Sequence, residues 1–573
     1  MSSPTVTDFT EYSKQITEEF LQTIMVVDDR AFFTEKESSA INTEVISPGA
    51  PSFSARGVEG VEKSVDQEFT ETNKSDNEVA QSSVDAAHGL NAKKLIEDFA
   101  ARKIVCAVVR PKDVEVDSLG DKVYPLADSS DIVVFDWVLY GATDGGKVKE
   151  LITEITRRSS QDEKRIRLIV VYTGEEDLAE IIDQLASALQ AAGISDVEAK
   201  DPYTLEKGPV RITVYAKGNV PTSRENQDLS ARVIPIDSIP DTLIAEFADM
   251  TFGLISNVAI AAMGALRSNT HRLLTKFHPK LDAPFLAHRA MLPEPTDANT
   301  LLAYLVGAEL TAILEGADVS EKADRFEGND IIHSWLEMKE KAGFKFNERF
   351  RPQIPNAGIA DVLELIRKGV GNEQLKQELR AFANHPEKKQ LTRRLADDPD
   401  SASRLDSQFA ELTSIKSRYR EGKPTLVAGT ILLSAKERRG ILTTSYWVCI
   451  QPICNCFRLK EITSFPFLPL AIISDETKKF DLILPSDNGY SRAKVDYSPS
   501  KLVMKRFAPS TDNLQRVVAH SDGRGFFFRA SRGQRYYWVA ELRSEHAQRI
   551  INQFATGFSR VGVDESEWLR RSG

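Results

Sequence analysis

An alternation of apolar strands and amphipathic helices limits the possible folds of this chain more than any other feature. Segments of helical period at 146–158 and 175–192 separate short, nearly continuous apolar segments. Strands that are apolar along their whole length are buried on both faces, which is typical of a parallel sheet covered by helices. We therefore predict an α/β domain with a five-stranded parallel sheet, formed by the segments 23–27, 103–109, 131–140, 166–172 and 210–215.

Polar side chains lie where these strands end. Asp28 and Asp29 follow the first strand, Asp136 follows the apolar residues VVF of the third, and Thr173 and Lys217 follow the last two. Because the carboxyl ends of parallel strands meet at one edge of a sheet, we expect these side chains to form one patch. Clustered carboxylates repel one another unless a hard cation such as Mg²⁺ lies between them, and a carboxylate can also accept a phosphoryl group.

The five residues resemble the signature of response-regulator receiver domains, which have a flavodoxin-like fold. The resemblance implies that Asp136 is the phospho-acceptor and that Asp28, Asp29 and Asp136 bind Mg²⁺. It further implies that Thr173 is the switch hydroxyl and that Lys217 pairs with the phosphoryl group. These residues are the candidate catalytic and metal-binding groups of the chain.

The chain departs from the receiver pattern in four places. Tyr140 and Gly218 stand where a proline is usual, and Gly174 stands where an alanine is usual. In addition, a segment at about 35–88, rich in serine, threonine and acidic residues, separates Asp29 from Asp136 by more than an ordinary receiver does. This composition predicts a flexible acidic insertion. None of the departures removes a chemical group from the patch.

Changes in composition and hydrophobic periodicity along the chain predict three domains. Residues 1–240 form the receiver, 241–421 contain helical segments separated by proline and glycine, the first of them at 241–277, and 422–573 contain short strands followed by a closing helix. We expect an all-α middle region and a β-rich C-terminal domain, either a barrel or a sandwich. This organisation resembles the large, atypical response receiver domain proteins of bacteria, a family associated with conflict and phage-defence gene clusters and thought to pair with histidine-kinase-like ATPases.

The resemblance implies a signalling phosphoprotein of a bacterial two-component phosphorelay or antiviral defence system. A partner kinase would phosphorylate Asp136, and the helical and β-rich domains would transmit the switch. Phosphoryl acceptance is the only chemistry indicated, and no separate catalytic site is identified. Two alternatives remain at this point. The receiver can be an inactive interaction scaffold or sensor, or the chain can be an effector that binds or cleaves nucleic acid through its C-terminal domain.

Two motifs have competing interpretations. Gly141–Val148 has the glycine and lysine spacing of a phosphate-binding loop, but Val148 replaces the hydroxyl residue that holds Mg²⁺, so we predict a glycine-rich turn before a helix. Cys449, Cys454 and Cys456 lack the paired spacing of zinc fingers, and we predict cysteines buried in strands.

Arginine and aromatic residues interleave between residues 516 and 543, where there are six arginines and two acidic residues. This pattern fits stacking on single-stranded nucleic acid, and it fits equally a strand with one buried and one solvated face. The net charge of −11 argues against a protein that coats nucleic acid. We therefore favour a surface that binds a protein partner.

The remaining features indicate a soluble cytoplasmic protein with no membrane segment. Four cysteines do not make a disulfide framework, and the N-terminal 20 residues lack the apolar core of a signal peptide. The longest uncharged run, 250–266, is shorter than the ~20 apolar residues of a membrane-spanning helix. We predict that this run is a buried helix, with a homodimer interface as the alternative.

Overall fold

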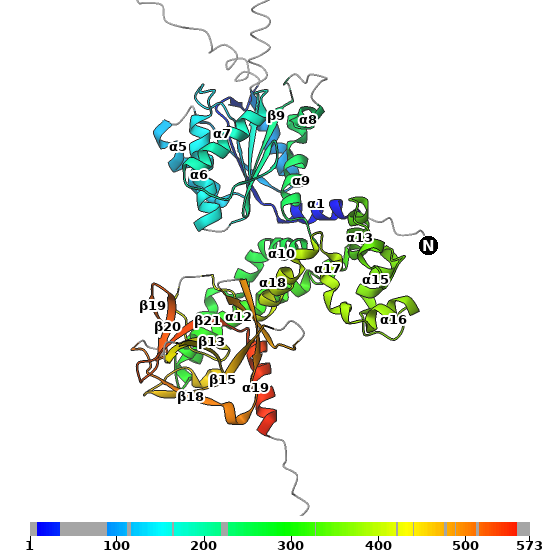
Figure 1. Ribbon diagram of the computed structural model, residues 1–573. Coiled ribbons are helices and arrows are strands. Elements are labelled where there is room, and N and C mark those ends of the chain that lie inside the picture. Colours follow the sequence, from blue (N-terminus) through cyan, green and yellow to red (C-terminus); the bar gives the residue numbers. More distant parts are fainter. Residues whose placement is uncertain are drawn as a thin grey trace, which may run out of the picture. The chain divides into compact units, whose positions relative to one another are not determined.

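The computed structural model describes residues 8–34, 89–111, 116–162, 165–218, 220, 227–326, 328–419, 422–438, 441–474, 478–486, 489–511 and 515–558. The predicted acidic insertion at about 35–88 lies outside the described residues. The chain divides into two compact units, Met1–Gly343 and Phe344–Gly573 (Figure 1). The predicted domain boundaries after residues 240 and 421 stay predictions.

A parallel sheet forms the centre of the first unit. Its strands are β1 (Thr23–Val27), β4 (Val105–Val109), β5 (Ile132–Phe135), β6 (Arg167–Thr173) and β9 (Val210–Lys217). They pair in the order β4-β1-β5-β6-β9, which is the flavodoxin-like order 2-1-3-4-5. The predicted five-stranded parallel sheet is therefore confirmed. The free edge of β9 pairs in addition with β10 (Val233–Ile234) and with a hairpin of β8 (Thr204–Lys207) and β7 (Glu198–Asp201).

Helices cover both faces of this sheet (Figure 1). One face packs against α5 (Leu119–Ser129), α6 (Gly146–Arg157) and α7 (Leu178–Ala191), and the other against α1 (Phe9–Phe20), α4 (Ala92–Ala101) and α9 (Ile239–Met250). Successive side chains of a strand point to opposite faces. In β5, Val133 and Phe135 accordingly enter the first core, while Ile132 and Val134 enter the second. The elements α8 (Gln227–Ser230), β2 (Ala31–Phe32) and β3 (Leu90–Asn91) complete this part of the unit.

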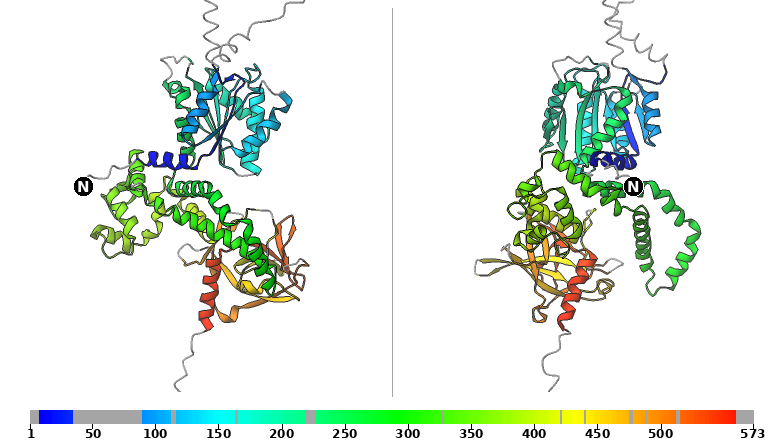
Figure 2. Two further views of the ribbon diagram at one scale, coloured as in Figure 1. Left: turned by 180° about the vertical axis from the view of Figure 1, so that it is seen from behind. Right: turned by 90° about the vertical axis from the view of Figure 1, so that its right-hand side faces the viewer.

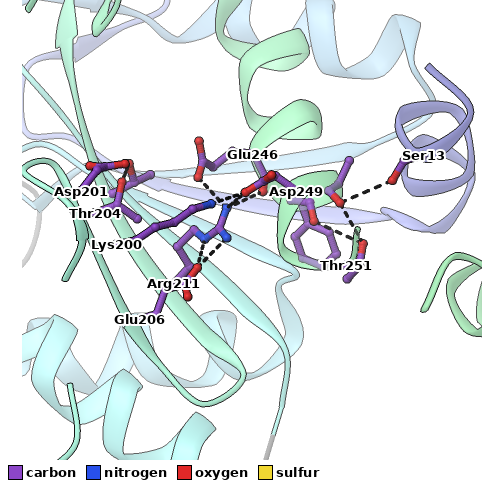
Figure 3. Close-up of polar contacts among 12 residues, drawn as sticks. Ser13, Lys200, Asp201, Thr204, Glu206, Arg211, Glu246, Asp249 and Thr251 are labelled. Carbon is purple, nitrogen blue, oxygen red and sulfur yellow. Dashed lines mark hydrogen bonds and ion pairs between the residues drawn. The ribbon is translucent and has the colours of Figure 1, made fainter. Parts of the chain in front are cut away.

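A cluster of ion pairs links α9 to strands β8 and β9 (Figure 3). Its centre is Arg211 of β9, whose guanidinium lies 2.5 Å from Glu206 of β8 and 2.8 Å and 2.7 Å from Glu246 and Asp249 of α9. Arg211 is only 4% exposed. In α1, the hydroxyl of Ser13 donates to the side-chain oxygen of Asn257.

The first unit continues into further helices. They are α10 (Leu254–Lys276), α11 (Asp282–Met291), α12 (Asp297–Gly316) and α13 (Ile331–Lys341), with the short strands β11 (Arg325–Phe326) and β12 (Asn329–Asp330) between the last two. A single helical segment is expected over 241–277, but α9 ends at Met250 and α10 begins at Leu254, after Gly253 with a φ of 158°. That backbone conformation favours glycine and breaks the helix.

Helix α10 is held against the sheet at the edge where β5 begins. Arg267 makes a bidentate pair with Asp131, with both N–O distances 2.9 Å, and also donates to the Phe20 carbonyl. Along the same helix, a Cβ at Gly264 would lie 3.3 Å from the Glu19 carbonyl oxygen, so the backbones of α1 and α10 approach closely. The prediction that the run 250–266 is buried holds for one face only, because Ile255 remains 62% exposed.

The second unit combines short helices with an antiparallel half-barrel. The helices are α14 (Phe346–Arg349), α15 (Ile359–Lys368), α16 (Gln377–Asn384), α17 (Leu391–Leu395), α18 (Ala402–Ser414) and the closing α19 (Ser544–Phe558). The strands are β13 (Thr430–Arg438), β14 (Ile441–Cys449), β15 (Thr463–Ile473), β16 (Leu482–Ser486), β17 (Gly489–Val495), β18 (Val503–Phe507), β19 (His520–Asp522), β20 (Gly525–Arg529) and β21 (Arg535–Glu541).

These strands confirm the predicted β-rich C-terminal domain. They pair in the order β16-β17-β15-β14-β13-β21-β20-β19, with β18 against β15. One core lies under α19, which contributes Ile550 and Phe554, and a second core gathers aromatic rings such as Phe507 and Phe528. Among the described residues of both units, no helix is long and apolar enough to cross a membrane.

Candidate metal centre

Three carboxylates meet where β1 and β5 end. The two strands are neighbours, with Val27 opposite Phe135, so the residues that follow them lie side by side. The backbone N–H of Asp136 donates to the Val27 carbonyl at 2.9 Å. One oxygen from each of Asp28, Asp29 and Asp136 lies within 4.8 Å of the others. The structure thus brings together the three residues predicted as metal ligands.

Lys217 enters the same cluster from the carboxyl end of β9. Its ammonium nitrogen lies 3.0 Å from Asp28 Oδ2 and 2.8 Å from Asp136 Oδ2. All three side chains are buried, with at most 3% exposed. Lys217 therefore binds two of the three carboxylates and is held away from water.

Thr173 lies at the same edge of the sheet, at the end of β6. Strand β6 runs between β5 and β9, and Thr173 is paired in register with Ala216, the residue before Lys217. The Thr173 side chain is fully buried, and its hydroxyl oxygen accepts a hydrogen bond from the Glu175 N–H at 3.2 Å. The position agrees with the expected patch, while the roles assigned to Thr173, Lys217 and Asp136 stay predictions.

Backbone N–H groups orient the carboxylates. Arg30 donates to Asp28 at 2.7 Å, Val138 donates to Asp136 at 3.4 Å, and Tyr140 donates to Asp29 at 2.8 Å. These backbone donors are not predictable from the sequence pattern. Tyr140 has a φ of 56°, an uncommon left-handed conformation for a residue other than glycine, and no signal in the sequence predicts that its N–H contacts a residue 111 positions earlier.

Burial and mutual repulsion shift the pKa values in the cluster. Burial, with the Asp136 charge as a smaller cause, raises the pKa of Asp28 to about 6 although Lys217 opposes the shift. Burial, and next the charge of Asp28, raises the pKa of Asp29. Burial alone would lower the pKa of Lys217, but the carboxylates of Asp136 and Asp28 outweigh it and raise that pKa above its usual value. The lysine consequently stays charged.

The cluster fits a divalent metal ion. Three ionised carboxylates and one ammonium carry a net charge of −2, which a divalent cation neutralises. Moreover, Asp29 Oδ1 is a buried oxygen without a hydrogen-bond partner, so it is available as a ligand. Carboxylate oxygens are the donors that hard cations such as Mg²⁺ prefer. On charge, donor type and the open oxygen, Asp28, Asp29 and Asp136 can therefore hold such an ion.

The glycine-rich segment Gly141–Val148 forms the turn before α6. Gly145 has a φ of 62°, and a Cβ at this position would lie 2.2 Å from the Trp137 ring. The Trp137 indole N–H donates to the Thr143 carbonyl at 3.1 Å. These contacts explain the glycine by packing, in agreement with the predicted turn.

The cysteines agree only in part with the prediction of buried strand residues. Cys449 is buried in β14 and Cys456 is buried after a 3-10 turn, but Cys454 is exposed. The prediction is wrong for Cys454 because that residue lies within the turn that follows β14, where its side chain meets solvent. All three are free thiols.

The arginine and aromatic residues of 516–543 occupy both faces of β20 and β21. Phe528 and Tyr536 are paired across the two strands and belong to the aromatic core. Arg529 and Arg535 are exposed on the other face, which they share with Phe527. The pattern matches the interpretation as strands with one face in the core and one toward solvent, except that Phe527 is 4% exposed because the Arg535 guanidinium lies over its ring.

Comparison with known proteins agrees with the geometry of the first unit. Residues 20–222 match the family model of the response receiver domain. The matched segment includes all five predicted site residues, from Asp28 to Lys217. Searches of curated protein sequences and of solved structures gave no match.

Proposed function

Because residues 20–222 are a response receiver domain, we propose that this protein is a signalling protein controlled by phosphorylation of Asp136. One observation carries the proposal. A buried lysine lies 2.8 Å from Asp136 Oδ2, within a carboxylate cluster that can hold a metal ion. Such a cluster would bring together a nucleophilic carboxylate, a bound cation and a lysine that neutralises the charge of the transferred phosphoryl group.

The proposed step is the transfer of a phosphoryl group to Asp136. A carboxylate oxygen of Asp136 forms the new bond to phosphorus, the bond between phosphorus and the donor atom breaks, and the leaving group takes the electron pair. Asp28, Asp29 and Asp136 would hold Mg²⁺, which neutralises charge on the phosphoryl oxygens. The ammonium of Lys217 and the hydroxyl of Thr173 would bind two of those oxygens.

Phosphorylation of Asp136 would change the ion pairs that Lys217 makes. Before transfer, its ammonium pairs with Asp28 and Asp136. A phosphorylated Asp136 presents up to two negative charges and three acceptor oxygens, so the ammonium gains a stronger partner. We expect Lys217 to move toward the phosphoryl group and β9 to adjust with it. The helical and β-rich parts of the chain would transmit this change, and a histidine-kinase-like ATPase is the proposed phosphoryl donor.

Phosphate incorporation tests the proposal. The full chain is mixed with a small acyl phosphate and Mg²⁺, and products are separated on a phosphate-retarding gel. We expect a Mg²⁺-dependent shift that Asp136→Asn abolishes and that Asp121→Asn, at an exposed carboxylate of α5, retains. Uptake of phosphate on an aspartate of the Asp136→Asn protein would contradict the acceptor assignment.

A second experiment follows if the gel shows no shift. If the wild-type chain takes up no phosphate, titration with beryllofluoride and Mg²⁺ measures whether the site binds a phosphoryl mimic. Binding that Asp136→Asn abolishes would leave the acceptor site intact and indicate a strict need for the kinase. No binding would refute phosphorylation control and favour an inactive receiver that acts as an interaction scaffold or sensor.

A further inference from the structure

Helices α10, α11 and α12 form a helical arm, residues 254–316, that exposes large apolar side chains. In the right-hand view of Figure 2, α11 and α12 (green) extend away from the parallel sheet. The exposed fractions of these side chains lie between 37% and 85%, and the residues are Ile255, Met263, Leu274, Leu281, Leu286, Met291, Leu302, Tyr304, Leu305 and Val306. Large apolar side chains exposed in this number along three successive helices mark an interaction site.

Helix α12 shows the mismatch between composition and burial most clearly. Its sequence, DANTLLAYLVGAELTAILEG, is apolar on all sides, which is typical of a helix surrounded by other protein. Yet Ala298 is the only buried side chain among those described in α12. A neighbouring protein surface would bury these side chains.

The charges of the arm divide into two opposite halves. Residues 254–291 contain five basic residues and one acidic residue, which gives a net charge of +4. Residues 292–316 contain four acidic residues and no basic one, which gives −4. Within one chain, Lys276 of the first half already pairs with Glu309 of the second at 2.5 Å. A second copy in antiparallel orientation would likewise place halves of opposite net charge face to face.

We propose that the helical arm is the interface of a homodimer. In a two-fold symmetric pair, the same surface of each copy forms both sides of the contact. The basic half of one arm would lie against the acidic half of its partner, and the reverse contact would follow by symmetry. The exposed apolar side chains of α12 would lie at the centre of this contact, and a stable interface buries ~800 Å² per partner. This inference does not depend on phosphorylation of Asp136.

Sedimentation of the full chain tests the dimer. We expect a dimer that dissociates on dilution. Tyr304→Glu combined with Leu305→Glu should raise the dimer dissociation constant about a hundredfold or more, because each substitution occurs twice in a symmetric interface. Ile453→Glu, at a side chain that is 62% exposed in the second unit, is the matched control and should leave the constant unchanged.

Charge-reversal variants distinguish the proposed interface from nonspecific association. Arg272→Glu places an acid in the basic half and should weaken the dimer about three- to tenfold. Lys494→Glu makes the same charge change on the second unit and should have no effect. Hydrogen exchange measured at two protein concentrations should show slower exchange of α12 at the higher one. A chain that is monomeric at all concentrations, or whose dimer tolerates the double substitution in α12, would overturn the proposal.

Discussion

In the absence of divalent cations, the contribution of Asp28 to the stability of the first unit should fall as the pH rises from about 4 to about 7. The cause is Asp28, whose carboxyl is buried and whose pKa lies at about 6 in the folded protein against an ordinary value of 3.8. A raised folded-state pKa contributes stability that is complete below pH 3.8 and is lost as the pH rises through 6. The difference between the two pKa values corresponds to about 3 kcal/mol of the free energy of unfolding.

Added Mg²⁺ should reverse most of this loss. Binding to the folded state alone stabilises by about 2.7 kcal/mol when the free ion is at 100 times its dissociation constant. Native-state hydrogen exchange of the β5 amides, corrected for the intrinsic rate at each pH, measures the effect next to the site. At pH 8 we expect exchange about 100-fold slower in saturating Mg²⁺ than in a chelator, and a much smaller ratio at pH 4.

Two variants locate the effect. Asp28→Asn removes the titrating group, so the pH dependence in a chelator should become shallower, with the part due to Asp29 remaining. Asp144→Asn, at an exposed carboxylate in the turn before α6, should leave the full dependence in place. An Asp28→Asn protein that keeps the whole pH dependence of the wild type would contradict the role given to Asp28.

Three further outcomes follow from the contacts. Lys217→Met leaves the carboxylates without their cation, so chemical denaturation in a chelator at pH 8 should show a loss of about 3–5 kcal/mol, and a smaller loss at pH 5. Arg211→Leu removes the buried cation that binds Glu246 and Asp249 of α9, so hydrogen exchange of 239–250 should accelerate by about tenfold, with Arg211→Lys between the two. Phe528→Ala opens a cavity in the aromatic core and should lower the free energy of unfolding of the second unit, measured by calorimetry, by about 3–5 kcal/mol. Met504→Ala, at a side chain that is 53% exposed, should change it by less than about 0.5 kcal/mol.

The predictable part of the molecule is the part that depends on local pattern. The parallel strands and the positions of Asp28, Asp136 and Lys217 at their ends follow from apolar runs, because burial on both faces and a common edge leave few arrangements for such a sequence. The break between α9 and α10 at Gly253 was missed, since a single glycine is tolerated inside a helical pattern. The contact of the Tyr140 N–H with Asp29 depends on two loops that meet only after the sheet has formed.

Arg211 and Lys217 show why a functional arrangement can exceed what a sequence pattern reveals. Both lie on β9, and their even spacing places them in one row of the strand, with Tyr215 between them. Tyr215 donates to Glu246 of α9 at 2.7 Å, and Arg211 binds Glu246 as well. The row therefore runs from the carboxylate cluster at one end to the contacts with α9 at the other, through three side chains of β9 that are at most 6% exposed. Under the proposed function, a displacement of Lys217 would shift β9. Because α9 is bound to β9 through Arg211 and Tyr215, we expect α9 to be the first element outside the sheet to change position.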